Sequence, residues 1–258
     1  MSALLGLSAL VTGGGSGIGL GTAQRLAADG ATVTIAGRTE EKLAKAAALI
    51  PGANYVVADV TDEADVEQAV VEAAAASGRL DVLFACAGGS RHGGPIISSD
   101  ADAWRATVDL NLVGTFLCIK HAAKLMMQNG GGSIIGMSSI AGHTTHRFMS
   151  AYCASKAGIE MLVKCAADEL GEYGIRVNGV QPGIVDTELM SFITAGGPVL
   201  ESYYENMPVA RVGTVADVAA VVAFLAGPES TWITGQMIGI DGGHQLRRGP
   251  DYTFFAES

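Results

Sequence analysis

Short apolar or β-branched runs alternate along this chain with longer, alanine-rich stretches. Apolar runs of about four to eight residues that are bounded by glycine or polar residues are typical of buried strands. We therefore predict strands at Ser8–Thr12, Thr32–Ala36, Asn54–Ala58, Val82–Ala85, Ser133–Met137 and Arg176–Val180. The stretches between them predict helices at Ile18–Ala28, Glu40–Ile50, Glu63–Ala76, Ala103–Gln128 and Ala151–Leu170.

Strands that are separated by helices of this length imply right-handed βαβ crossovers. Such crossovers give a parallel sheet with helices on both faces. No linker, low-complexity tract or internal repeat interrupts the alternation. We therefore expect a single α/β domain with a doubly wound sheet over residues 1–243, followed by a tail at 244–258.

Two segments depart from the alternation. Residues 186–211 form a long insert that contains Gly196-Gly197 and precedes the next regular helix. An insert of this kind predicts a lid over a pocket, and a packed pair of surface helices is the alternative. The tail carries the aromatic residues Tyr252, Phe254 and Phe255, and we expect it to form a subunit interface rather than a substrate contact.

Composition restricts the classes of partner. Hydrophobic residues make up 49% of the 258 residues and the formal net charge is −10. A nucleic-acid partner is not expected, because binding one requires a basic face. No apolar run reaches the roughly 18 residues that span a bilayer, and the apolar N-terminus lacks the basic flank of a signal peptide. The cytoplasm is the expected location.

The cysteines and histidines do not predict a metal site. The four cysteines form no CxxC pair, and Cys86, Cys118 and Cys165 lie in stretches where we expect buried thiols. Cys153 follows a tyrosine and is an oxidisable thiol without a predicted catalytic role. The loop residues His143 and His146 have no carboxylate close by in the sequence, so we expect polar surface positions or a substrate contact.

A glycine-rich loop follows the first predicted strand and opens the first helix. Glycine permits a tight turn and a close approach of the backbone to a pyrophosphate, whose charge the N–H groups at a helix N-terminus attract. The loop therefore predicts a dinucleotide site. Its expected contacts are Gly13, Ser16, Gly17, Ile18 and Gly19.

The end of the second strand indicates which dinucleotide binds. In such folds an acidic side chain at this place holds the ribose 2′-hydroxyl, but here Gly37 occupies it and Arg38-Thr39 follow. A guanidinium matches a phosphate dianion, and the threonine hydroxyl could add a donor. We predict NADP(H) in preference to NAD(H); an arginine that stacks on adenine without selecting is the alternative.

Tyr152 and Lys156 are four residues apart in a predicted helix, so their side chains lie on one face. A free phenol has a pKa of about 10. An ammonium about 4 Å away, at an effective dielectric constant of about 20, favours the phenolate by up to ~4 kcal/mol. Such a shift brings the pKa of a phenol close to neutrality, where proton transfer is efficient. Ser139 ends a strand thirteen residues earlier, at the edge of the sheet where ligands bind.

These elements together resemble the short-chain dehydrogenase/reductase family, from about Leu7 to Gly243, and within it the 3-oxoacyl reductase-like members. The resemblance implies a Rossmann fold of about seven strands. It also implies that Ser139 polarises a substrate carbonyl, that Tyr152 transfers the proton and that Lys156 assists Tyr152 and holds the nicotinamide ribose. Asn111 matches the fourth catalytic member, with a water-linked proton relay as its implied role and a satisfied core asparagine as the alternative.

The same resemblance implies further cofactor contacts. Asp59 and Val60 match the adenine-binding position, although Asp59 could instead cap the helix that begins near Asp62. Cys86 replaces the usual asparagine before the small residues that let the backbone pass the cofactor. The implied contacts beyond the glycine loop are Asp59, Val60, Ala87, Gly88, Pro182, Gly183, Ile184 and Thr187, together with Tyr152 and Lys156.

The function that these predictions favour is reversible hydride transfer between a nicotinamide and a secondary alcohol or ketone. A 3-oxoacyl thioester reductase is the specific alternative within the enzymes, and a dinucleotide-binding sensor without catalysis is the rival class. Fold and motif cannot choose the substrate. A homotetramer is expected from the resemblance.

Overall fold

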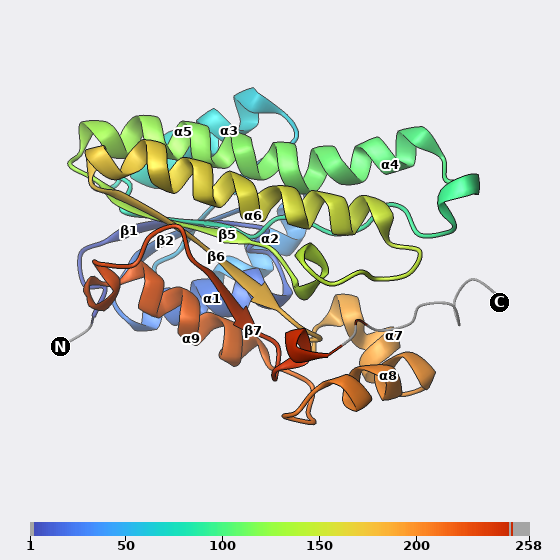
Figure 1. Ribbon diagram of the computed structural model, residues 1–258. Coiled ribbons are helices and arrows are strands. Elements are labelled where there is room, and N and C mark those ends of the chain that lie inside the picture. Colours follow the sequence, from blue (N-terminus) through green and yellow to red (C-terminus); the bar gives the residue numbers. More distant parts are fainter. Residues whose placement is uncertain (1–2, 248, 250–258) are drawn as a thin grey trace.

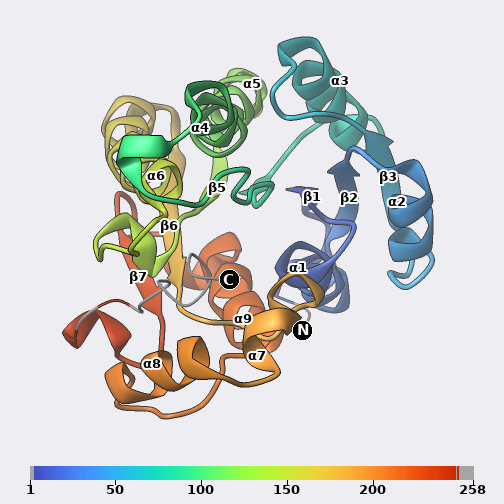
Figure 2. The same ribbon diagram turned by 90° about the vertical axis from the view of Figure 1, so that its right-hand side faces the viewer.

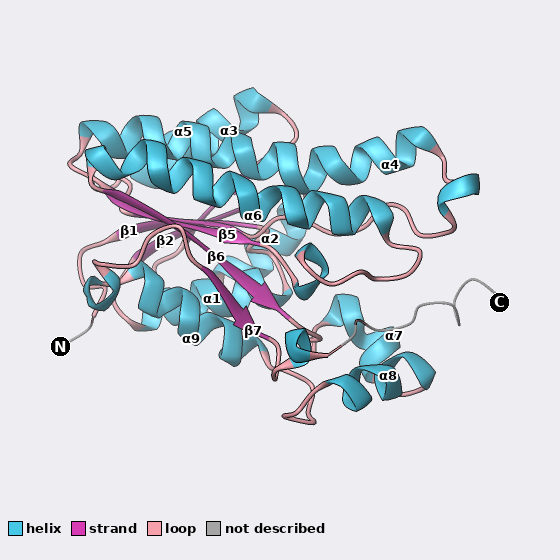
Figure 3. Cartoon of the chain, viewed as in Figure 1, coloured by secondary structure: helices cyan, strands magenta, loops and turns pink. Residues whose placement is uncertain are grey.

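The computed structural model describes residues 3–247 and 249, and the tail aromatics Tyr252, Phe254 and Phe255 lie outside the described residues. The described part forms one layer of sheet between two layers of helices (Figures 1 and 3). The strands are β1 (Ser8–Thr12), β2 (Thr32–Gly37), β3 (Asn54–Val57), β4 (Val82–Ala85), β5 (Gly132–Met137), β6 (Ile175–Pro182) and β7 (Met237–Ile240). The helices are α1 (Gly17–Ala28), α2 (Glu40–Ala47), α3 (Glu63–Ala74), α4 (Ala101–Val108), α5 (Gly114–Gln128), α6 (Ser150–Leu170), α7 (Ser191–Thr194), α8 (Pro198–Asn206) and α9 (Val215–Ala226).

The strands pair in the order β3-β2-β1-β4-β5-β6-β7, and all six pairings are parallel. This arrangement confirms the predicted doubly wound sheet. The strand order reverses between β1 and β4, so the connections that leave these two strands diverge at their carboxyl ends. In open α/β sheets, ligands bind in the crevice at this point. Figure 2 views the sheet from that edge.

Alternate side chains of each strand enter the two halves of the core. In β1, Ala9 and Val11 face the side covered by α1, α2 and α9, whereas Leu10 faces the side covered by α3, α5 and α6. Both faces are therefore buried, as parallel sheets require. This explains why the central strands read as continuous apolar runs in the sequence.

The helix predicted over Glu63–Ala76 ends at Ala74, and two other predicted helices differ more from the structure. The helix predicted to reach Ile50 ends at Ala47, because Ile50 precedes Pro51 and a residue before proline disfavours the helical conformation. The single helix predicted over Ala103–Gln128 consists of α4, a π-helical turn (Asp109–Val113) and α5. No sequence prediction named the bounds of α9 or of β7.

The π-helical turn has an identifiable cause in its own side chains. Asn111 donates from Nδ2 to the Thr107 carbonyl oxygen at 2.8 Å, and the Thr115 hydroxyl donates to the Asn111 carbonyl oxygen at 2.6 Å. These bonds satisfy carbonyls that a widened turn leaves without their usual partners. The turn thus places Asn111 beside the carboxyl end of β4.

The insert at 186–211 is mostly helical and packs on the carboxyl edge of the sheet. It contains a short turn (Glu188–Met190), α7 and α8. Buried side chains from α7 and α8 form a third apolar cluster with Ile140 and Ile184, which follow β5 and β6. Within the described ranges, no helix has the length and apolar character that crossing a bilayer requires.

Candidate functional site

The loop between β1 and α1 forms a cradle that only glycine can build at two of its positions. Gly13 has φ +69°, and a Cβ there would lie 3.0 Å from the Cα of Ala87. A Cβ on Gly19 would overlap the carbonyl oxygen of Gly13. The loop therefore lies tightly between α1 and the end of β4, and its outer surface is open to a ligand.

The N-terminus of α1 has N–H groups available for a phosphate. The helix begins at Gly17, and the preceding Ser16 is exposed and makes no side-chain capping bond. The first turn of such a helix attracts an anion through its unpaired N–H groups and its dipole. A pyrophosphate fits here.

The segment after β6 reaches the same cradle from the other side. A Cβ on Gly17 would lie 3.5 Å from Cγ2 of Thr187, so two predicted cofactor contacts that are far apart in the sequence lie together. Gly183 passes close to β7, since a Cβ there would lie 3.0 Å from the Cα of Asp241. Ile184 is buried and joins the cluster that supports α7 and α8.

Arg38 and Thr39 are exposed at the carboxyl end of β2, next to the loop that carries Asp59. Burial alone would raise the pKa of Asp59, but hydrogen bonds from Thr61 and the positive charges of Arg38 and Arg91 outweigh burial and lower that pKa. An ionised carboxylate and a guanidinium therefore lie near each other at this end of the site.

Asp59 does not cap the following helix. Its Oδ1 accepts hydrogen bonds from the Thr61 N–H at 3.0 Å and the Thr61 hydroxyl at 2.8 Å, whereas Asp62 is the residue that caps α3. The helix-cap alternative for Asp59 is therefore wrong. Val60 is buried and packs against Gly114 at the start of α5.

The end of β4 passes the middle of the site. The N–H groups of Cys86 and Ala87 both donate to the Thr12 hydroxyl, at 3.1 and 3.2 Å, so a threonine on β1 fixes this strand end. Burial raises the pKa of the Cys86 thiol to about 12 against the opposing effect of Lys156, so the thiol is neutral. A Cβ on Gly88 would meet Asn111 Oδ1 at 2.6 Å and Lys156 Nζ at 3.5 Å.

Asn111 is fully buried, and its side chain binds the backbone after β4. Oδ1 accepts from the Gly89 N–H at 3.0 Å, and Nδ2 donates to the Gly89 and Thr107 carbonyl oxygens at 2.7 and 2.8 Å. Both N–H donors are thus used inside the protein. The water relay stays a prediction, and a relay through this side chain would have to use the second lone pair of Oδ1.

Ser139 lies two residues after the end of β5, and Tyr152 and Lys156 lie in the first two turns of α6, where Lys156 reaches the end of β5. The Ser139 hydroxyl accepts from the Ala141 N–H at 3.2 Å and lies 3.5 Å from the Pro182 carbonyl oxygen. Lys156 Nζ lies 5.4 Å from the centre of the Tyr152 ring, so the two side chains face each other. Ser139 and Tyr152 are half-buried and can be reached from outside.

Lys156 is buried, with 3% of its surface exposed, and Nζ donates to the Met137 carbonyl oxygen at 2.8 Å. Burial lowers the pKa of Lys156 to about 8, a shift that the nearby Cys86 slightly opposes. At pH 7 the side chain is still mainly an ammonium. Because water is excluded around it, its field on the adjacent phenol is only weakly screened.

Two sequence expectations outside these residues need correction, and one residue of the site was missed. His146 is buried, with 7% exposed, because loop 143–149 folds back on the tail segment that carries His244; the expectation of a polar surface position is wrong. Cys165 is exposed, since it lies on the outer face of α6. Sequence reasoning missed Glu160, whose carboxylate lies behind Ser139; its position four residues after Lys156 on the same helix could have revealed it.

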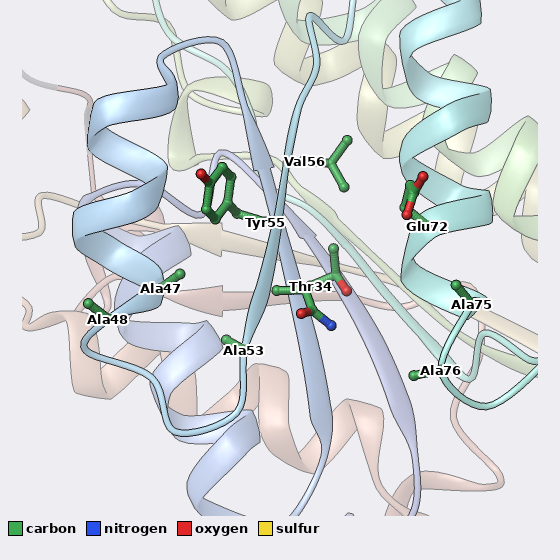
Figure 4. Close-up of a pocket in the computed structure, with 10 residues that line it drawn as sticks. Thr34, Ala47, Ala48, Ala53, Tyr55, Val56, Glu72, Ala75 and Ala76 are labelled. Carbon is green, nitrogen blue, oxygen red and sulfur yellow. The ribbon is translucent and has the colours of Figure 1, made fainter.

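Two hollows in the described surface do not enclose the reacting side chains. A groove of about 720 Å³ lies along the edge strand β3, between the ends of α2 and α3, and small side chains line most of it (Figure 4). A second hollow of about 290 Å³ lies behind Ile184, beside the Arg211–Asp217 ion pair. The described part of the chain gathers no group of three or more His, Cys, Asp or Glu side chains able to hold a metal ion.

Comparisons with known proteins show which family this chain resembles. A family model described as enoyl-(acyl carrier protein) reductase matches residues 13–245. The chain is 38% identical over 239 residues to cis-4-hydroxycyclohexanecarboxylate dehydrogenase of Sinomonas cyclohexanicum, covering 92% of this chain and 95% of that protein. It is 36% identical over 246 residues to levodione reductase of Leifsonia aquatica, covering 91% and 92%.

A solved structure gives the same result for the fold. A short-chain type dehydrogenase/reductase from Mycobacterium ulcerans superposes with a TM-score of 0.96 at 44% sequence identity, covering 98% of this chain and 94% of that chain. The chain therefore belongs to the short-chain dehydrogenase/reductase family of oxidoreductases.

Proposed function

We propose that this enzyme transfers a hydride between NADP(H) and a secondary alcohol or ketone, with Tyr152 as the general acid/base. The observation that carries the proposal is the placement of Lys156 Nζ 5.4 Å from the Tyr152 ring, with the same Nζ bound to the Met137 carbonyl oxygen at the end of the strand that precedes Ser139. A buried cation next to a reachable phenol stabilises the phenolate that remains when the proton leaves.

In the direction of reduction, the Ser139 hydroxyl donates a hydrogen bond to the substrate carbonyl oxygen and polarises it. Tyr152 then gives its proton to that oxygen, and the Lys156 ammonium stabilises the phenolate. A bound nicotinamide supplies the hydride. Asn111 fixes Gly89 and the adjacent Gly88, so the backbone that borders the site keeps one position. In the direction of oxidation the same groups act in reverse.

The cofactor's phosphates are proposed to lie on the N-terminus of α1, with Gly13, Ser16, Gly17, Ile18 and Gly19 around them and Thr187 opposite. Asp59 and Val60 would border the adenine, and Ala87 and Gly88 the nearer ribose. Pro182, Gly183 and Ile184 would border the nicotinamide. Tyr152 and Lys156 would reach the nicotinamide ribose.

Arg38 is proposed to favour NADP(H) by binding the 2′-phosphate. Replacing Arg38 with aspartate removes the guanidinium and adds a repelling charge, so kcat/KM with NADPH should fall at least about tenfold relative to NADH. The matched control is Arg25→Asp, an arginine on the far side of α1 that pairs with Asp29. Steady-state kinetics with both cofactors measure the ratio; an unchanged ratio in the Arg38 variant contradicts the proposed selection.

The substrate is proposed to be a compact ketone or alcohol with an apolar ring. Ile193, Leu200 and Tyr203 of α7 and α8 pack against Ile140 and Ile184, immediately beside Ser139. We propose that residues 186–211 act as the lid, which this buried apolar cluster holds against the loop after Ser139. One relative is named for a hydroxycyclohexanecarboxylate, which is an alicyclic alcohol, and this supports the same choice.

A panel of ketones read by loss of NADPH absorbance tests the function. It should include substituted cyclohexanones and, for the alternative within the family, a 3-oxoacyl thioester. Turnover of the cyclic ketones is the expected result, whereas preferred turnover of the thioester would select that alternative. Quenching of protein fluorescence by NADPH without turnover of any carbonyl would instead identify a dinucleotide sensor.

We also propose a homotetramer. Large apolar side chains are exposed on two separate faces: Val113, Phe116 and Met161 on α5 and its neighbours, and Phe224 and Trp232 near β7. Trp232 is 99% exposed, which costs free energy in water unless a partner covers it. Light scattering should give about four times the 26.3 kDa chain mass, and Trp232→Asp should reduce it to about two chains. A monomer at micromolar concentration contradicts the proposed assembly.

A further inference from the structure

A cluster of polar side chains lies behind Ser139, outside the predicted site. Ser138 is 2% exposed and Gln181 is 5% exposed, while Glu160 and His143 complete the cluster from α6 and from the loop after β5. Buried polar groups are retained at a cost unless they are hydrogen-bonded to one another. The bonds that these groups make therefore indicate what they do.

The bonds converge on one carboxylate oxygen. Glu160 Oε1 accepts from Gln181 Nε2 at 2.6 Å and from the Ser138 hydroxyl at 3.0 Å, and His143 Nδ1 lies 3.8 Å away. An ionised acceptor makes these bonds about twice as strong as bonds between neutral groups. A Cβ on Gly142 would overlap this oxygen, so the glycine leaves room for the carboxylate.

The side-chain nitrogen of Gln181 contacts both Glu160 and His143, and these contacts determine the tautomer of neutral His143. One N–H of Gln181 Nε2 donates to Glu160, and the same nitrogen lies 3.1 Å from His143 Nδ1. A nitrogen with two donor hydrogens requires an acceptor at both contacts. In the neutral form, His143 therefore carries its proton on Nε2, and the amide of Gln181 has one orientation only.

Three members of the cluster lie next to reacting residues or to the backbone that borders them. Ser138 precedes Ser139 at the end of β5, and Gln181 precedes Pro182, whose carbonyl oxygen lies 3.5 Å from the Ser139 hydroxyl. Glu160 lies four residues after Lys156 on α6. The carboxylate thus joins the two strand ends that border the site to the helix that carries the tyrosine and the lysine.

We propose that Glu160 is a positioning residue, which holds the end of β5 and the end of β6 at a fixed distance from α6 and so sets Ser139 relative to Tyr152. This inference rests on the proposed function, because the distance matters only if Ser139 and Tyr152 act on one oxygen. A misplacement of about 1 Å between groups that act together can lower a rate as much as about a hundredfold.

The test compares Glu160→Ala, Glu160→Gln and the control Glu169→Ala, which changes an exposed glutamate on the same helix. Glu160→Ala should lower kcat about tenfold at saturating cofactor and substrate, with the dissociation constant for NADPH within about twofold of the parent. Glu160→Gln keeps an acceptor oxygen and should recover kcat to within about threefold. The active fraction is counted by NADPH-binding stoichiometry, so a loss of folded protein is not read as a loss of rate.

Hydrogen–deuterium exchange of segments 138–143 and 181–184 supplies a readout that needs no turnover. Exchange should be faster in Glu160→Ala than in the parent and in Glu169→Ala. A kcat within twofold of the parent in Glu160→Ala, or no recovery in Glu160→Gln, overturns the inference. If the parent turns over no carbonyl, the proposed function fails, and unchanged exchange in Glu160→Ala would then overturn the positioning role separately.

Discussion

Replacing Tyr152 with phenylalanine should lower kcat/KM by about three orders of magnitude, because the variant keeps the ring but has no proton to give or take. General acid–base transfer contributes about 10²–10⁴-fold to rates. The ring itself remains above Lys156, so the shape of the site is kept. Steady-state kinetics with the best ketone of the panel measure the loss.

The control for this prediction is Tyr173→Phe, which removes an exposed phenol after α6 and should leave kcat/KM unchanged. NADPH should bind the Tyr152 variant with a dissociation constant within a few-fold of the parent value, since one hydrogen bond to the cofactor contributes about 1 kcal/mol. A Tyr152 variant that keeps more than a tenth of the parent kcat/KM would remove the general-acid role. A variant that no longer binds NADPH would point to a binding role instead.

The fold could be predicted from the sequence because its strands are short apolar runs and its helices are longer alanine-rich stretches. Runs such as Val82–Ala85 are apolar throughout, and only a sheet that is buried on both faces accommodates them. Interruptions within a predicted helix were harder to predict. The π-helical turn depends on where the side chains of Asn111 and Thr115 find carbonyl oxygens, and composition does not reveal such contacts.

The candidate site likewise contains residues that local spacing predicts and residues that only the tertiary structure brings together. The glycine cradle and the Tyr152–Lys156 pair follow from local spacing, so the sequence predicts them directly. Glu160 and Gln181 meet only because β6 lies beside β5 and α6 packs across both strands. His146 is buried by a segment about a hundred residues later, and no local pattern predicts that contact.

Replacing Lys156 with methionine should lower kcat/KM by about two orders of magnitude. At the 5.4 Å that separates Nζ from the ring centre, an effective dielectric constant of about 20 gives an attraction of about 3 kcal/mol between the ammonium and a phenolate. Methionine matches the length of the lysine stem but provides no charge. The control is Lys164→Met, an exposed lysine two turns further along α6, which should leave the kinetics unchanged.

The same substitution should stabilise the protein at pH 7, and this separates charge from packing. Burial lowers the pKa of Lys156 from the usual 10.5 to about 8, so the folded protein holds this proton less tightly than the unfolded chain does. Below about pH 8 the resulting penalty is fully present, at about 3 kcal/mol; as the pH rises towards 10.5 the unfolded chain also loses the proton and the penalty disappears.

The Met137 carbonyl oxygen loses its donor in the variant, which costs about 1–2 kcal/mol, so the net gain in the free energy of unfolding should be about 1–2 kcal/mol at pH 7. Denaturant titrations at pH 7 and pH 9.5 measure the free energy of unfolding of both proteins. Between these pH values the free energy of unfolding of the parent should rise by about 2 kcal/mol relative to that of the variant, since all other titrating groups are common to both proteins. A difference that does not change with pH would mean that Lys156 titrates normally, and the weakly screened ammonium on which the catalytic proposal depends would be lost with it.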